Sequence, residues 1–181
     1  MATLGRGALG TIVQSYRHTR FKVLVGRDGI LQAVGVTKVF AKQASVRWSG
    51  TRQRGQGVIS TPRAALKMAL YASTGNLRRR GTDPSELIAA AHAGSFSLTL
   101  ANELAEAGYH PRQIETTATV TMENRVNGWT MTQIHLDVIA TVPKVAECDF
   151  VDAALHARAN CPVSRALNAN ISMHAQLNRN K

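Results

Sequence analysis

The sequence is poor in cysteine, and its first half is poor in acidic residues. Its two cysteines, Cys148 and Cys161, form no CxxC pair and no His/Cys pair at the spacing of metal ligands. This arrangement excludes a disulfide scaffold and a zinc site, and it favours a reducing compartment. We therefore expect neither a metal ion nor a cofactor.

Long hydrophobic runs are also missing. The longest apolar stretch, from Leu87 to Leu104, is interrupted by six polar residues, whereas a spanning helix needs roughly 18 continuous apolar residues. We expect a soluble protein without a membrane partner. A chain of 181 residues with 44% hydrophobic content is sufficient for one core and short for two, so one domain with an appendage is expected.

Charge is divided unevenly along the chain. Residues 1–82 hold 15 Lys and Arg against one acid, Asp28 (net +14), whereas residues 83–181 hold 7 basic and 10 acidic residues (net −3), within a total of +11. Since each cation that meets a phosphate releases counterions, this split is typical of a protein with a polyanionic partner. The alternative is a basic targeting segment together with a solvated face. The candidate nucleic-acid contacts are Arg6, Arg17, Arg20, Lys22, Arg27, Lys38, Lys42, Arg52, Arg54, Arg78, Arg79 and Arg80.

Residues 1–43 form a basic extension. Its first 27 residues carry five Lys and Arg among Ser, Thr and Ala and contain no acidic residue. This composition is typical of a mitochondrial transit peptide. From Phe21 to Val39, however, two β-branched runs flank Arg27-Asp28-Gly29 and predict a hairpin. The pattern predicts a protein of the mitochondrial matrix whose extension is a transit peptide in part, and whether that segment is cleaved stays open.

Strands are indicated by alternation in residues 44–181. ASVRWSG and GQGVIST read as two strands joined by a basic loop, and residues 64–71 fit a strand or a helix. Residues 114–123 and 132–140 alternate around Asn127-Gly128, which predicts a long antiparallel hairpin. A last strand covers residues 171–177. Trp48 and Trp129 are expected in the core or at a dimer contact.

Two main helices accompany these strands. Asp83 as N-cap, Pro84 and Glu86 predict a capped helix that runs to about Glu106 and stops at Gly108. A second helix starts at Glu147 and is expected to carry Phe150, Val151, Ala154, Leu155 and Arg158, and a short helical turn at residues 164–167 follows. The fold class is α+β, with helices on one face of an antiparallel sheet.

Two segments carry a family resemblance. GTDPSELIAAAHAGSF with SLTLANELAEAGY, and later NCPVSRALNANISM, resemble the two signatures of the OsmC/Ohr family of thiol peroxidases. The hairpin TTATVTMENRVNGWTMTQIHL between them and the early WSGT and GQGVIST strands agree with it, so the resemblance spans Ser45 to Leu177. It implies an OsmC-like sheet packed on two main helices over residues 44–181, and an intertwined homodimer.

The resemblance implies chemistry that this sequence no longer supports. In the family, one cysteine attacks the peroxide, a second resolves the sulfenic acid as a disulfide, and a Glu and an Arg activate the first thiolate. The resolving cysteine matches Cys161, but the attacking cysteine falls at Ser95 and the glutamate at Ser85. A serine hydroxyl is too basic to attack a peroxide at neutral pH. Arg78 is the nearest match to the arginine, although Arg78 to Arg80 read equally well as a phosphate-binding cluster.

Other candidate residues have weaker signals. His92 lies three residues before Ser95 on one helix face, but no orienting carboxylate accompanies this pair, so a satisfied core histidine is favoured over a hydrolase pair. Cys148 lies near a helix start, where a thiolate is favoured. His135 and Asp137 are interpreted as a solvated strand face.

Three functions follow as hypotheses. The first is a catalytically inactive OsmC-like protein recruited as a structural, RNA-associated component of a mitochondrial ribonucleoprotein, with the ribosome, its rRNA and neighbouring proteins as the most concrete partners. The second is a thiol-dependent hydroperoxide reductase that uses Cys161, or a Cys-to-Ser mutant of one. The third is a small-molecule binder that uses the emptied pocket between Ser95 and Cys161.

Overall fold

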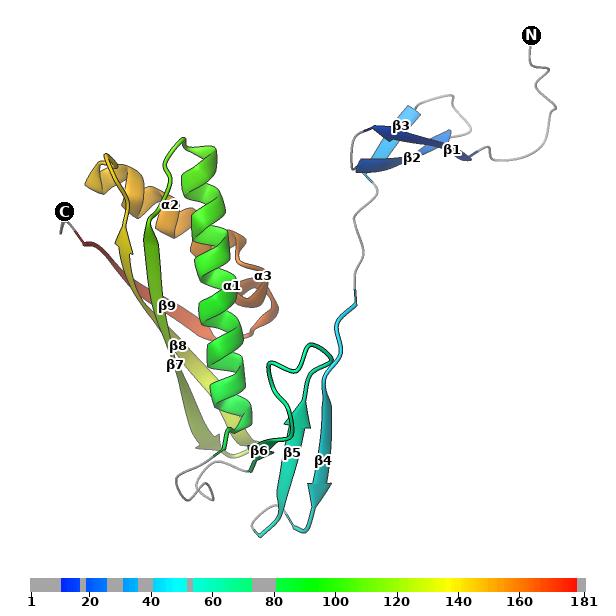
Figure 1. Ribbon diagram of the computed structural model, residues 1–181, viewed down its shortest axis with the longest axis vertical. Helices are drawn as coiled ribbons and strands as arrows, with labels where there is room; N and C mark the ends of the chain where they lie inside the picture. The colour runs from blue at the N-terminus through cyan, green and yellow to red at the C-terminus, as the bar shows by residue number, and fades with distance from the viewer. Residues whose placement is uncertain are drawn as a thin grey trace. The chain divides into compact units, whose positions relative to one another are not determined.

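The computed structural model describes residues 11–16, 19–25, 31–35, 41–51, 54–72 and 81–178 (Figure 1). The chain divides into two units, Met1–Gln43 and Ala44–Lys181. In the first unit, β1 (Thr11–Tyr16), β2 (Thr19–Val25) and β3 (Leu31–Gly35) pair in that order as an antiparallel sheet. The predicted hairpin is the β2–β3 pair, and its Asp-Gly turn falls outside the described residues. β1 was not predicted.

The second unit starts with a small antiparallel sheet in the order β4-β5-β6. β4 (Ser45–Ser49) and β5 (Gln56–Ser60) confirm the two predicted strands. A Cβ at Gly57 would lie 2.5 Å from the carbonyl oxygen of Arg47, so this close approach of the two strands requires glycine. The indole of Trp48 packs edge-to-face on Tyr71 with ring centroids 6.2 Å apart.

Most of residues 64–71 form neither a helix nor a strand. Ala64 and Met68 have φ values of 57° and 50°, in the left-handed region, which interrupts both regular structures. Only the end of this stretch is regular: β6 (Ala69–Tyr71) is a strand that pairs with β5.

The predicted central helix is α1 (Pro84–Glu106). Asp83 caps it, because its carboxylate accepts hydrogen bonds from the backbone N–H groups of Ser85 (2.8 Å) and Glu86 (3.0 Å). Pro84 occupies the first turn, where a missing N–H costs nothing. The helix ends before Gly108, whose φ of +85° suits glycine.

The largest sheet has the order β7-β8-β9 and lies against α1 and α2 (Figure 1). β7 (Gln113–Arg125) and β8 (Gly128–Thr141) form the predicted antiparallel hairpin, with a register shift at Thr121/Met122. β9 (Asn170–Leu177), however, runs parallel to β8. The predicted α+β class with helices on the sheet is confirmed, but the antiparallel prediction is wrong for β9, since the helical connection between β8 and β9 is a crossover that returns the chain in the same direction.

That connection consists of α2 (Glu147–Asn160) and α3 (Pro162–Ala166). α2 buries Phe150, Ala153, Ala154 and Ala157, whereas Val151 and Leu155 are exposed. The buried face of α2 is therefore formed by Phe150 and small alanines, which allow α2 to lie close to α1.

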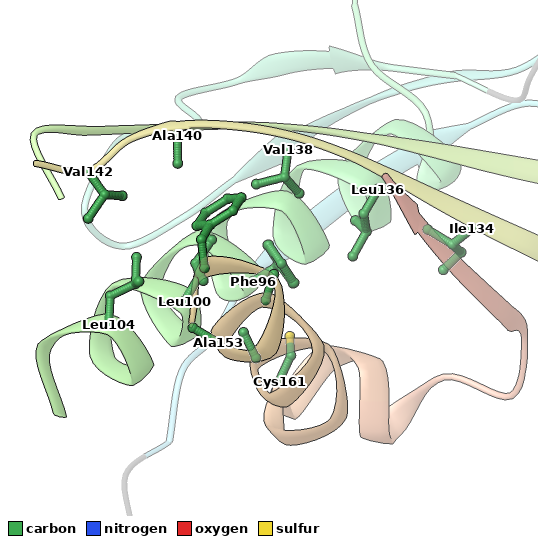
Figure 2. Packing of buried hydrophobic residues seen from close by; sticks show 13 residues of the cluster. Phe96, Leu100, Leu104, Ile134, Leu136, Val138, Ala140, Val142, Ala153 and Cys161 are labelled. Atoms are coloured by element: carbon green, nitrogen blue, oxygen red, sulfur yellow. The ribbon is translucent and has the colours of Figure 1, made fainter. Parts of the chain in front are cut away.

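The core lies between this sheet and its helices. Phe96, Leu100 and Leu104 of α1 meet the inner face of β8 and the alanines of α2 (Figure 2). Alternate residues of β8 point inward, as predicted: Ile134, Leu136, Val138 and Ala140 are buried. Trp48 and Trp129 lie outside this core, with exposed fractions of 37% and 57%.

Candidate functional site

Two polar residues of the candidate site, His92 and Ser95, lie on α1. His92 and Ser95 are one helical turn apart, so they share a face of the helix. His92 is fully buried, and Ser95 is half-buried. Gly94, between them in sequence, is exposed, and among the described residues no atom outside its own helix backbone lies within 4 Å of a Cβ built on it.

Cys161 lies between the two helices of the connection. It is the last residue before α3, its backbone N–H donates to the carbonyl of Ala157, and its side chain is fully buried in the core cluster (Figure 2). Pro162 follows it in the first turn of α3. The Cys161 thiol donates a hydrogen bond to Ser95 Oγ at 3.3 Å. Two residues that are 66 positions apart in sequence therefore meet side by side.

His92 pairs with a different serine. Its Nε2 lies 2.8 Å from Ser164 Oγ on α3, and in the described part of the chain its Nδ1 has no partner. Burial lowers the pKa of His92, so the ring is neutral. Among the described residues, His92 therefore forms no hydrolase pair with Ser95, and no carboxylate bonds to its ring. Sequence analysis missed Ser164, although its position one turn after Cys161 was a signal.

Burial is the largest influence on the Cys161 thiol and raises its pKa. Hydrogen bonds that involve the Ser95 side chain, the backbone and side chain of Ser164, and the backbone of Val163 act against burial and lower the pKa. Together they outweigh burial and leave the pKa of Cys161 below the ordinary value of a thiol. Cys161, Ser95, Ser164 and His92 form one hydrogen-bonded group, which we call the thiol cluster.

The other positions carried over from the family lie apart from these bonds. Ser85 is in the first turn of α1 and donates its backbone N–H to Asp83. Glu86 beside it is exposed. Arg78, Arg79 and Arg80 are outside the described residues.

Cys148 lies at the start of α2, as predicted. It is exposed, and its thiol is 3.6 Å from a carboxylate oxygen of Asp149. α2 separates it from Cys161 by 13 residues, or about 20 Å at 1.5 Å per residue. A disulfide needs Cα atoms roughly 4.4–6.8 Å apart, so Cys148 and Cys161 of one chain do not pair.

The candidate nucleic-acid contacts are only partly described. Arg20 and Lys22 lie on β2, and Lys42 and Arg54 are exposed. The remaining ones, Arg6, Arg17, Arg27, Lys38, Arg52 and Arg78 to Arg80, lie outside the described residues.

The described part of the chain contains no group of three potential metal ligands, and none of its helices is long and apolar enough to cross a membrane. His135 lies 2.7 Å from Ser172 Oγ and 3.3 Å from Asp137 on the outer sheet face. A cavity of about 470 Å³, lined by residues around Arg112 and Lys144, shares no residue with the thiol cluster.

Comparisons with known proteins agree with this fold. Two solved structures share it: an OsmC-like protein of unknown function from Vibrio cholerae (TM-score 0.64, 12% identity, 76% of this chain and 100% of that one) and the organic hydroperoxide resistance protein OhrB of Bacillus subtilis (TM-score 0.57, 20% identity, 74% and 98%).

Sequence comparison is more specific. The peroxiredoxin OsmC of Escherichia coli K12 is 37% identical over 137 residues, which cover 75% of this chain and 96% of that protein. The peroxiredoxin OsmC of Shigella flexneri matches equally well. A family model described as OsmC-like protein matches residues 74–175. The chain therefore belongs to the OsmC family.

Proposed function

We propose that this chain is a catalytically inactive member of the OsmC family that serves as a structural, RNA-associated component of a mitochondrial ribonucleoprotein, most concretely the mitochondrial ribosome. The observation that carries the loss of activity is the Ser95–Cys161 pair, in which a hydroxyl and a thiol meet at 3.3 Å. A two-cysteine peroxidase needs sulfur at both positions, because its first thiolate attacks the peroxide and its second forms the disulfide.

No other cysteine of the chain replaces the missing sulfur. Cys148 is about 20 Å from Cys161 along α2 and is exposed on the far end of that helix. The glutamate position is also changed, to Ser85, so two parts of the thiolate-activating arrangement differ from the family pattern. This double change supports a natural loss of activity over a single engineered Cys-to-Ser substitution.

The charge distribution supports an RNA partner. Residues 1–82 carry a net charge of +14, which is more than solubility alone requires. Lys42 and Arg54 within this segment are exposed. Contacts of this kind follow the phosphate backbone and carry little base specificity. The leader-like composition of the first 27 residues supports the mitochondrial matrix as the location.

The test is sedimentation of the endogenous protein from a gentle mitochondrial lysate, with and without ribonuclease, at low and moderate salt. We expect co-migration with a large particle that collapses after ribonuclease treatment. A peak of free monomer or dimer size under every condition would overturn the ribonucleoprotein role.

A second candidate is a hydroperoxide reductase that uses Cys161. It is favoured by the lowered pKa of the buried Cys161 thiol and by the 37% identity to a peroxiredoxin. It requires multiple turnovers of hydroperoxide with a dithiol reductant, lost in Cys161→Ala. Absence of turnover in the unmodified chain would remove it.

A further inference from the structure

The cavity near Arg112 and Lys144 lies where one end of the largest sheet meets the start of α2. The first residue of β7 pairs with Thr141 at the end of β8, and Leu177 at the end of β9 pairs with Ala140. The backbone N–H of Arg112 donates to the carbonyl of Thr141 at 2.8 Å, which holds the segment before β7 at this end of the sheet. Strand ends and a helix start therefore surround a cavity of about 470 Å³, a size typical of sites for small organic molecules.

The walls of this cavity are largely aliphatic. Val142 is buried, Val145 and Leu177 are half-buried, and Pro143 lies between the two valines in the lining. These side chains neither donate nor accept hydrogen bonds, and they gain free energy when apolar surface covers them. This part of the cavity therefore favours a ligand with a hydrocarbon body.

Charged side chains line the same cavity. Among the described residues, the side chains of Arg112 and Lys144 have no ion-pair or hydrogen-bond partner. A guanidinium and an ammonium in this state attract a carboxylate, which the guanidinium binds through two parallel hydrogen bonds. Glu147 also lines the cavity and repels a second negative charge. The lining, with two cations and one acid, is therefore complementary to a single negative charge.

The backbone of Lys144 is in a conformation that lysine rarely adopts. Its φ of +64° lies in the left-handed region, where a Cβ crowds the neighbouring carbonyl. Pro143 and Lys144 form a turn, and a turn with proline at its second position and a positive φ at its third is formed most easily with glycine at the third. Such strain is typical of residues whose side chain has a role, and the Lys144 side chain is part of the cavity lining.

We propose that this cavity binds a small aliphatic monocarboxylate. The carboxylate lies between Arg112 and Lys144, and the hydrocarbon chain lies on Val142, Val145 and Leu177. The site shares no residue with the thiol cluster. It goes beyond the proposed function and does not depend on it, so it holds whether or not the chain binds RNA.

The experiment is a titration of the isotope-labelled full chain with octanoate, followed through the backbone amide signals in nuclear magnetic resonance spectra. We expect saturable shifts at the amides of residues 144–147 and 177–178. Two probes of equal chain length are the controls: 1-octanol has no charge, and suberate has a second carboxylate. Each should bind about fivefold more weakly than octanoate, the upper range for one exposed ion pair. The proposal is overturned if these amides do not shift, or if the three probes bind equally.

Variants of Lys144 separate ligand binding from folding. Lys144→Gly removes the cation and relieves the turn, so we expect an unfolding midpoint that is no lower than in the parent chain, together with octanoate binding about fivefold weaker. Lys144→Arg keeps the charge and should keep the affinity. Arg165→Gln removes the same charge from an exposed position outside the cavity and should leave octanoate binding unchanged. Equal affinities in Lys144→Gly and Arg165→Gln would contradict the site.

Discussion

Ser95 Oγ lies 3.3 Å from Cys161 Sγ, so α1 and the junction of α2 with α3 meet at a hydroxyl–thiol pair. The two side chains come from positions 66 residues apart and are in hydrogen-bond contact. On the proposed function, these are the two positions at which a two-cysteine peroxidase of the family carries sulfur, and this chain has sulfur at only one of them.

Restoring sulfur at this position is the first prediction. In Ser95→Cys, we expect mild oxidation to close a disulfide with Cys161, because the two side chains already touch. The cross-link should raise the free energy of unfolding by up to about 4 kcal/mol on the loop-entropy estimate. Denaturant unfolding with and without reductant measures this gain, and intact mass shows the loss of both thiol hydrogens.

The matched control is the double variant Ser95→Cys with Cys161→Ser, which again holds one sulfur at the site. It should show no stabilisation by oxidant. If both thiols of Ser95→Cys stay open to alkylation after oxidation, the contact between α1 and Cys161 is not close enough in solution.

Much of the fold could be predicted from the sequence, because its local signals are strong. Asp83 with Pro84 marks the start of α1, and alternation over residues 114–123 and 132–140 around Asn127-Gly128 marks the β7–β8 hairpin. The parallel pairing of β9 could not be read in this way, since alternation is the same in both directions and only the path of α2 and α3 decides it.

The contacts of the candidate site could also be predicted only in part. The meeting of Ser95 with Cys161 was implied by the family resemblance, and the structure brings them together. The His92–Ser164 contact was not implied, because no periodicity links residues on two different helices. Val151 and Leu155 show the converse limit: a hydrophobic side chain on a helix carries no sign of which face will be covered.

The core provides the second prediction. Phe96 is fully buried on α1, so Phe96→Ala should lower the free energy of unfolding by about 3–5 kcal/mol through lost burial and a cavity. Leu98, two residues on, is 76% exposed, and Leu98→Ala should change the stability by less than about 0.5 kcal/mol. Chemical denaturation compares the two. Similar losses in both variants would mean that another molecule covers Leu98 in solution.

The third prediction concerns pH. Because burial lowers the pKa of His92 in the folded chain, the unfolded chain binds a proton at a higher pH than the folded chain does. Stability from His92 is therefore fully present above its ordinary pKa of about 6.5 and is lost as the pH falls through that value, by at most about 1.4 kcal/mol per pH unit.

His92→Gln tests this sign, because glutamine keeps an N–H for Ser164 and does not titrate. Unfolding midpoints between pH 7.5 and pH 5 should fall less steeply in this variant than in the parent chain. Equal slopes would show that His92 binds a proton at the same pH in the folded and unfolded chains, and the lowering of its pKa by burial would then be wrong.

The fourth prediction tests whether Arg78, Arg79 and Arg80 contact RNA directly or only add to the net charge of the chain. Replacing Arg78, Arg79 and Arg80 with Gln should weaken binding to single-stranded RNA and reduce the slope of log affinity against log salt by about 2, since each phosphate neutralised contributes roughly 0.7. The same replacement at Arg112, Arg158 and Arg165 removes equal charge from the acid-rich half of the chain. Filter binding at several salt concentrations compares the two triple variants. Equal reductions of the salt slope in the two triple variants would mean that net charge, and not the basic first half, attracts the RNA. Long-range attraction depends on total charge, whereas counterion release depends on the residues that touch phosphate.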